Sequence, residues 1–314
     1  MDRKLLLWFC KELLKISLLY EKFKGVSFDY FISYSNLIKE ILPIQPRSSI
    51  RKTWINYRIH NMMTNIYRKH PYLFSGFDKI IGVENIMEWV KEGGILLSFH
   101  YGDYRYGPRA VAQLLLKRVP KLKFIMLVDQ ESYNEEIKLK YKKVGVEFII
   151  AEQVNIGLKL YRLISNNNWV YVYLDGNTGV GNDSSPINVN FLSSKIYIRS
   201  GLFRLMGRLH KPIIPVITRI NEGKRELIIY PAVFIETNKV QEGAEKCFKY
   251  FREEILKSPE HWRLWYRHHW QVINWATNIS FEKNEKAMNI FCKVKKLNLR
   301  LGSEGNVYKT IDKG

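Results

Sequence analysis

The sequence has few cysteines and no long apolar run. Its three cysteines, Cys10, Cys247 and Cys292, lie far apart and lack the spacing of a metal site. Such isolated cysteines are typical of reduced thiols in an intracellular protein. The apolar run at residues 5–10 is short and is interrupted by Lys11-Glu12. The sequence therefore predicts neither a cleavable signal nor a helix that spans a membrane.

Acidic residues are also scarce. The 314 residues include 50 Lys and Arg against 30 Asp and Glu, a net charge of +20. This excess favours a polyanionic partner: nucleic acid, an anionic membrane face, or a phosphorylated carrier or cofactor. The absence of helix-turn-helix, zinc or RNA-recognition signatures disfavours nucleic acid. A Walker loop and a G-x-G-x-x-G motif are both missing, which disfavours a nucleotide-driven enzyme.

The hydrophobic pattern predicts a helical N-terminal part. Residues 1–24 carry apolar side chains at helical spacing with lysines between them, and further helical segments follow at 27–47 and 49–69. The first helix either docks on the core or lies on an anionic membrane leaflet, and the two roles are compatible.

From Phe77 onward, short strands alternate with helices. Strands are expected at 79–83, 94–99, 124–128, 146–150, 169–174 and 213–217, and helices at 85–92, 105–118, 134–144, 154–166, 196–209 and 239–256. The alternation predicts an α/β fold with a mostly parallel central sheet covered by helices on both faces. We expect a helical N-terminal extension (1–76), an α/β domain (77–270) and a C-terminal tail of unassigned role (271–314). Residues 302–306 suit a hairpin turn between two short strands.

Polar residues follow the buried strand 94–99. His100 stands at its carboxyl end, where open α/β sheets bind ligands, and histidine readily takes a proton near neutral pH. Asp103 is close enough in sequence to orient the imidazole. The alternative is a surface histidine with a helix-capping aspartate.

A polar loop at 175–195 should leave the same sheet edge and forms a second candidate site. Asp175 either caps the next turn or contacts substrate. Lys195 and Arg199 are either substrate contacts or ordinary surface charge. In the cluster at 260–270, the tryptophans favour packing, and His268-His269 lacks the partners of a metal site.

Several motifs resemble those of a known family. His100-Tyr101-Gly102-Asp103-Tyr104-Arg105 is similar to the His-x-Gly-Asn-x-Glu core of the bacterial lipid A lauroyl/myristoyl acyltransferases, within the lysophospholipid acyltransferase superfamily. Val170–Gly176, Phe191–Val216 and Pro259–His268 resemble three later motifs in the same order. The sequence departs from the pattern at Asp103, where the family has Asn, and at Arg105, where it has an acid.

The resemblance implies a glycerolphosphate acyltransferase-like fold and an enzyme that moves a fatty acyl group from an acyl-carrier-protein or coenzyme A thioester to a hydroxyl or amine of a lipid-like acceptor. His100 would be the base and Asp103 its orienting partner. Arg105 would contact a phosphate, and Asp175, Lys195 and Arg199 would bind substrate. We expect no bound cofactor or metal, and a monomer.

We expect a peripheral location on the cytoplasmic face of the inner membrane, or a cytoplasmic one. Two other function classes stay open at this stage. The first is an inactive homologue that binds an acyl carrier or lipid, which Arg105 supports. The second is a nucleic-acid-binding protein, which only charge and aromatic content support.

Overall fold

The computed structural model describes residues 3–136, 145–176 and 185–275, together with three C-terminal strands. The chain forms two compact units. The first unit comprises residues 1–75, 190–196 and 256–314, and the second comprises 76–189 and 197–255. The division into domains at 76/77 and 270/271 stays a prediction.

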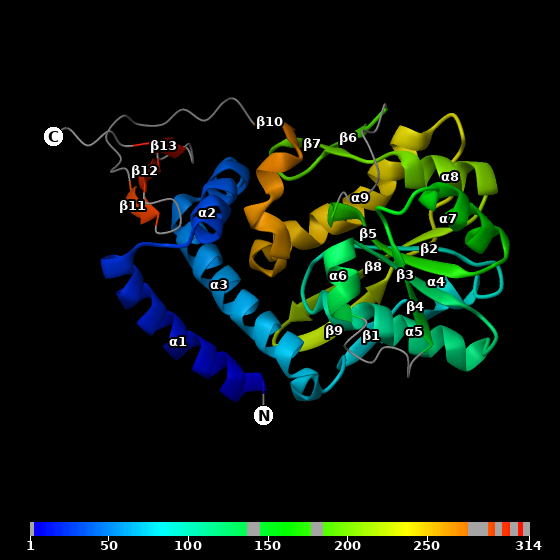
Figure 1. The fold of residues 1–314 in the computed structure, drawn as a ribbon, viewed down its shortest axis with the longest axis horizontal. Coiled ribbons are helices and arrows are strands. Elements are labelled where there is room, and N and C mark those ends of the chain that lie inside the picture. Colours follow the sequence, from blue (N-terminus) through cyan, green and yellow to red (C-terminus); the bar gives the residue numbers. More distant parts are fainter. Residues whose placement is uncertain are drawn as a thin grey trace. The chain divides into compact units, whose positions relative to one another are not determined.

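A seven-stranded sheet forms the centre of the second unit, in the order β1-β9-β8-β2-β5-β3-β4 (Figure 1). Its strands are β1 (Lys79–Ile81), β2 (Gly94–Ser98), β3 (Phe124–Val128), β4 (Val146–Ile150), β5 (Trp169–Tyr173), β8 (Ile213–Asn221) and β9 (Lys224–Ile229). All neighbours pair in parallel except the β8–β9 hairpin. Every residue of β2 is buried, as expected of a central strand covered on both faces. The predicted α/β fold with a mostly parallel sheet is confirmed.

Helices cover both faces of this sheet, with α5 on one side and α7, α8 and α9 on the other (Figure 1). The helices of the second unit are α4 (Val83–Met87), α5 (Gly107–Arg118), α6 (Gln130–Glu136), α7 (Ile156–Ser165), α8 (Gly201–Leu209) and α9 (Val240–Lys257). Part of the predicted helix 134–144 and part of the loop 175–195 lie outside the described residues.

The helix predicted over 196–209 is wrong in its first part. Residues Lys195–Ile198 form strand β7, and α8 begins only at Gly201. Ile196 and Ile198 are buried while Lys195 is exposed, which is the alternation of a strand with one covered face. Pairing with another strand stabilises this segment as a strand. β7 lies antiparallel to β10 (Val272–Asn274) in the sheet β10-β7-β6, where β6 is Ile187–Asn190.

The first unit contains helices α1 (Arg3–Lys24), α2 (Phe28–Ile41) and α3 (Arg47–Lys69), as predicted. Helix α1 packs on α3 and buries Leu6, Cys10 and Leu14, which recur every fourth residue. Strands β11 (Met288–Cys292), β12 (Leu297–Leu301) and β13 (Val307–Lys309) form an antiparallel sheet, and the predicted turn at 302–306 between the last two lies outside the described residues. Among the described residues, no helix is both long enough and apolar enough to span a bilayer.

A buried ion pair joins the three sequence segments of the first unit. Glu40, at the end of α2, contacts Nε2 of His268 at 2.5 Å, and both side chains are fully buried. The backbone N–H groups of Ser193 and Ser194 donate to Glu40 Oε2, and the Ser194 hydroxyl donates to Oε1. Burial alone would raise the pKa of Glu40, but attraction to His268 and these hydrogen bonds hold that pKa below its usual value.

Replacing Glu40 should unfold the first unit more readily. Glu40→Gln leaves His268 buried without its carboxylate, so we expect the free energy of unfolding to fall by about 3–5 kcal/mol. Urea unfolding measures this loss. The matched control is Glu12→Gln, because Glu12 pairs with Lys15 on the exposed side of α1 and should change stability by less than about 0.5 kcal/mol. Equal effects of the two substitutions would contradict the central role of Glu40.

The same pair predicts a dependence of stability on pH. Because the folded-state pKa of Glu40 lies below its unfolded value, its stabilisation is complete above about pH 4.3 and is lost as the pH falls through the folded-state pKa. Wild type should therefore weaken in acid more steeply than Glu40→Gln. If the stability of the two proteins fell equally with pH, Glu40 would not be the cause of the pH dependence.

Candidate active site

The register of two neighbouring strands brings His100 and Asp175 together. In the parallel pair β2–β5, Ser98 lies beside Tyr173. His100 and Asp175 each follow two residues later, so they leave the sheet level with each other at its carboxyl edge. The Asp175 Oδ1 atom lies 2.8 Å from His100 Nδ1, and its Oδ2 atom accepts the backbone N–H of His100 at 2.9 Å. Asp175 therefore fixes both the ring and the backbone of His100.

Aromatic rings complete the setting of His100. The Tyr173 ring stacks on the imidazole at a centroid distance of 4.3 Å, and Tyr104 meets it edge-on at 4.9 Å. The Tyr173 hydroxyl donates to the carbonyl of Tyr104 at 2.8 Å. This bond links β5 to the turn that follows His100. The imidazole is thus held on its face by Tyr173 and at Nδ1 by Asp175.

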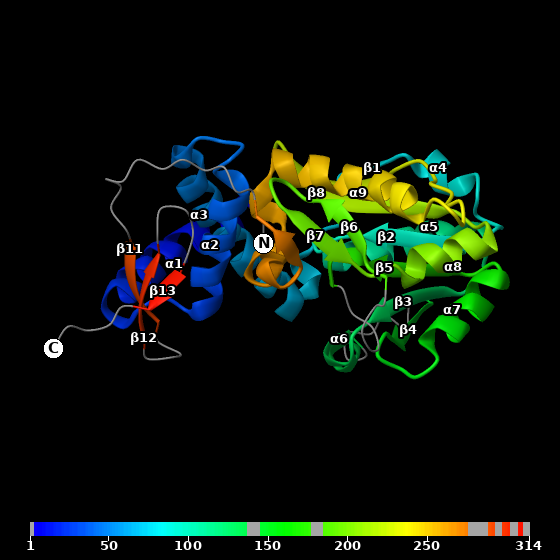
Figure 2. The ribbon, with the colours of Figure 1, turned by 90° about the horizontal axis from the view of Figure 1, so that it is seen from above.

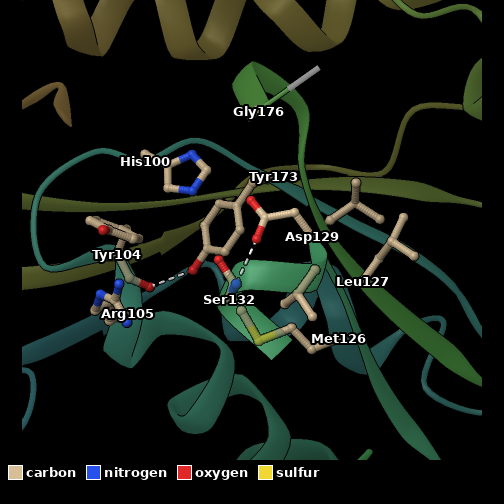
Figure 3. Close-up of a pocket in the computed structure, with 11 residues that line it drawn as sticks. His100, Tyr104, Arg105, Met126, Leu127, Asp129, Ser132, Tyr173 and Gly176 are labelled. Carbon is tan, nitrogen blue, oxygen red and sulfur yellow. Dashed lines mark hydrogen bonds between the residues drawn. The ribbon is translucent and has the colours of Figure 1, made fainter. Parts of the chain in front are cut away.

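A small pocket opens beside His100 (Figure 3). His100, Tyr104 and Arg105 lie on one side, and residues from the end of β3 and the start of α6 lie on the other. Its volume of about 70 Å³ holds the equivalent of several water molecules. The lining residues are His100, Tyr104, Arg105, Met126, Leu127, Val128, Asp129, Ser132, Val172, Tyr173 and Gly176. The pocket therefore combines a histidine, a cation and a carboxylate over an apolar floor.

Asp129 has a local structural role within this pocket. Its Oδ1 atom accepts the backbone N–H of Ser132 at 2.6 Å, in the first turn of α6. Aspartate is a favoured residue immediately before a helix, because its carboxylate satisfies an N–H group that has no partner within the helix. Asp129 thus fixes the start of α6 at the edge of the pocket.

The predicted orienting role of Asp103 is corrected by the geometry. Asp103 is buried, and its Oδ2 atom accepts from Arg225 Nε at 3.0 Å. The three-residue spacing from His100 does not form a helical turn, since Gly102 between them has a left-handed φ of 61°. The carboxylate at His100 is that of Asp175, for which we predicted only a cap or a substrate contact.

Close contacts with β8 fix the turn between His100 and Arg105. A side chain at Gly102 would place its Cβ 2.3 Å from the backbone oxygen of Thr218, so only glycine fits. The Thr218 hydroxyl donates to the carbonyl of Tyr101 at 2.5 Å, and the Tyr101 hydroxyl donates to the carbonyl of Glu254 at 2.8 Å. The turn is therefore held on the side of α9, and Arg105 faces the pocket from its other end.

The remaining predicted substrate contacts do not line the pocket. Lys195 is exposed at the start of β7 in the first unit, and Arg199 follows β7 in the second. Trp262 and Trp265 are buried, as predicted for packing residues. Burial is the first cause that lowers the pKa of His269, followed by the charges of His268 and Lys39. The described residues include no group of histidines, cysteines or acids suited to a metal ion.

The comparison with known families covers the residues that form this site. No curated protein matches the sequence. The sequence does match the family model for bacterial lipid A biosynthesis acyltransferases over residues 45–272, which is most of the chain. The matched range contains His100, Arg105 and Asp175 and all seven strands of the central sheet. The protein is an acyltransferase, and the chain belongs to the bacterial lipid A biosynthesis acyltransferase family.

Proposed function

We propose that the protein moves a fatty acyl group from a carrier-protein or coenzyme A thioester to a hydroxyl or amine of a lipid-like acceptor, with His100 as general base. The contact of 2.8 Å between His100 Nδ1 and Asp175 carries this proposal. A carboxylate accepts a hydrogen bond from Nδ1–H, which leaves Nε2 with the lone pair that takes a proton. Asp175 is the positioning residue, because it acts through His100.

With these two residues, the proposed reaction needs no reactant other than the acyl thioester and the acceptor. His100 Nε2 takes the proton of the acceptor as its oxygen or nitrogen attacks the thioester carbonyl carbon. The resulting C–S cleavage expels the thiolate, which receives that proton from His100 and leaves as the thiol. Asp175 stabilises the imidazolium between these steps, as a buried carboxylate does in hydrolases with a histidine base.

Arg105 is compatible with this chemistry because the acid comes from β5 instead. The Asp175 carboxylate holds His100 Nδ1 at 2.8 Å, so position 105 does not have to supply the acid. Arg105 lines the pocket and suits a phosphate group of coenzyme A or of the carrier arm. The small pocket volume suits the reacting head groups.

Catalysis should depend on Asp175 far more than on Asp103. We expect Asp175→Asn to lower kcat by roughly 10²–10⁴-fold, because the base loses its tautomer and its charge partner, and His100→Ala to be lower still. Asp103→Asn should instead lower stability, since it removes the negative charge from the buried pair with Arg225. Turnover of an acyl thioester, corrected for the folded fraction, separates the two effects.

Glu147→Gln is the control for that assay, because Glu147 is exposed on β4. Full activity of Asp175→Asn would remove Asp175 from the mechanism. Full activity of His100→Ala would remove the proposed base, and thioester left intact by wild type would contradict the proposed reaction.

Arg105 should act on the donor. With Arg105→Gln, KM for acyl-coenzyme A should rise about tenfold because a charge-assisted phosphate contact is lost, and Arg105→Lys should keep part of the affinity. A phosphate-free acyl thioester of N-acetylcysteamine should have the same KM with both variants and wild type. A similar rise for that donor would show that Arg105 serves another part of the reaction.

Helix α1 supports a peripheral membrane location. One face is buried against α3, while Trp8, Ile16 and Phe23 are exposed on the opposite side. Lys4, Lys11 and Lys15 follow each other at helical spacing along the border of that exposed face and are solvent-accessible. An apolar face bordered by lysines is the arrangement of a helix that lies on an anionic leaflet.

Binding to vesicles should therefore need both the exposed apolar side chains of α1 and the lysines that border them. We expect cosedimentation with anionic but not neutral vesicles, weakened in high salt, and a large loss with Trp8→Ser combined with Phe23→Ser. Tyr72→Ser is the control, because Tyr72 is an exposed aromatic residue of the first unit outside α1. Unchanged binding of the double variant would exclude α1 as the contact.

A further inference from the structure

Three of the exposed apolar side chains in the second unit lie in one short segment. Val154 is 83% exposed, Leu158 51% and Tyr161 46%, and all three lie in the loop after β4 or on α7. Leu158 and Tyr161 are three residues apart on the helix and share one face. Soluble proteins seldom expose such a cluster unless it meets a partner.

All charged residues on the helices at this cluster are basic. Helices α7 and α8 lie side by side in both views (Figures 1 and 2), and neither contains Asp or Glu. Their exposed charged residues are Lys159, Arg162, Arg204 and Arg208. We call Leu158, Tyr161 and these four cations the α7–α8 face. It combines two exposed apolar side chains with four exposed cations on two adjacent helices.

The sheet places one end of this face at the edge that carries the active site. β4 pairs with β3 in parallel and in register, with Val128 beside Ile150. The loop before α7 therefore leaves the same carboxyl edge as Asp129, which lines the pocket at the end of β3. A partner bound on α7 near this loop lies at the sheet edge from which the pocket is reached.

We infer that the α7–α8 face docks an acidic acyl carrier protein that presents the thioester on its flexible arm. The inference rests on the proposed function, which requires a thioester donor. Charge complementarity favours an acidic protein partner, since the two helices expose four cations and contain no acid. The face has only two exposed apolar side chains, whereas the long exposed stripe of α1 is the part suited to a bilayer.

Charge reversal on α8 tests the inference by binding as well as by turnover. Arg204→Glu with Arg208→Glu should weaken binding of fluorescently labelled holo acyl carrier protein by about tenfold or more and reduce the salt dependence of binding. In turnover, KM for the acyl-carrier donor should rise equally, while kcat and the KM for acyl-pantetheine stay unchanged. Leu158→Ser should weaken carrier binding without changing its salt dependence.

The matched control is Lys117→Glu with Arg118→Glu, two exposed cations at the end of α5. Equal carrier binding by this control and the α8 variant would overturn the inference. So would loss of vesicle binding or of self-association, rather than carrier binding, in the α8 variant. Carrier binding that depends on α8, in a protein that consumes no thioester, would uphold the docking face and refute the proposed reaction instead.

Discussion

The parallel register between β2 and β5 is the constraint on which the active site depends. It sets Ser98 beside Tyr173 and so delivers His100 and Asp175 to the same level of the sheet edge. A slip of one residue would send every side chain of β2 to the opposite face. Gly94 opposes that slip, because a side chain in its place would put its Cβ 2.4 Å from the backbone oxygen of Pro212. The register that packs the apolar residues of β2 therefore also brings His100 and Asp175 into contact.

Under the proposed function, this arrangement accounts for an arginine in the first motif. In the family pattern, the acid stands on the same turn as the histidine, at the position of Arg105. Here the acid that contacts His100 comes from the neighbouring strand, 75 residues further along the chain. The turn itself is fixed independently by Gly102 against Thr218 and by Asp103 on Arg225. Arg105 consequently lines the pocket, while Asp175 holds His100.

Local patterns predicted the elements well and their long-range pairings poorly. The strand at 94–98 and the helices of the first unit follow from apolar periodicity, which is a property of adjacent residues. The partners of His100, Asp103 and Glu40 lie 75, 122 and 228 residues away, and spacing along the chain carries no information about them. Strand β7 was mistaken for helix for the same reason, since its pairing with β10 outweighs local propensity. We did expect His100 and Asp175 to share one sheet edge. Their contact could have been predicted from the sequence, because each lies two residues beyond the end of its strand and the two strands pair.

The two carboxylate pairs around the turn differ in exposure, and this difference fits the roles that we propose for them. In the Asp103–Arg225 pair both side chains are nearly inaccessible, at 5% and 4%. Such a pair holds backbone in place but cannot exchange protons with a substrate. In the His100–Asp175 pair the carboxylate is 1% exposed while the imidazole is 22% exposed. The acid is thus shielded from water, which strengthens its interaction with the ring, and the ring remains open to the pocket. In the proposed mechanism, Asp175 orients His100 from the shielded side, and the accessible side of the ring takes the proton of a bound acceptor.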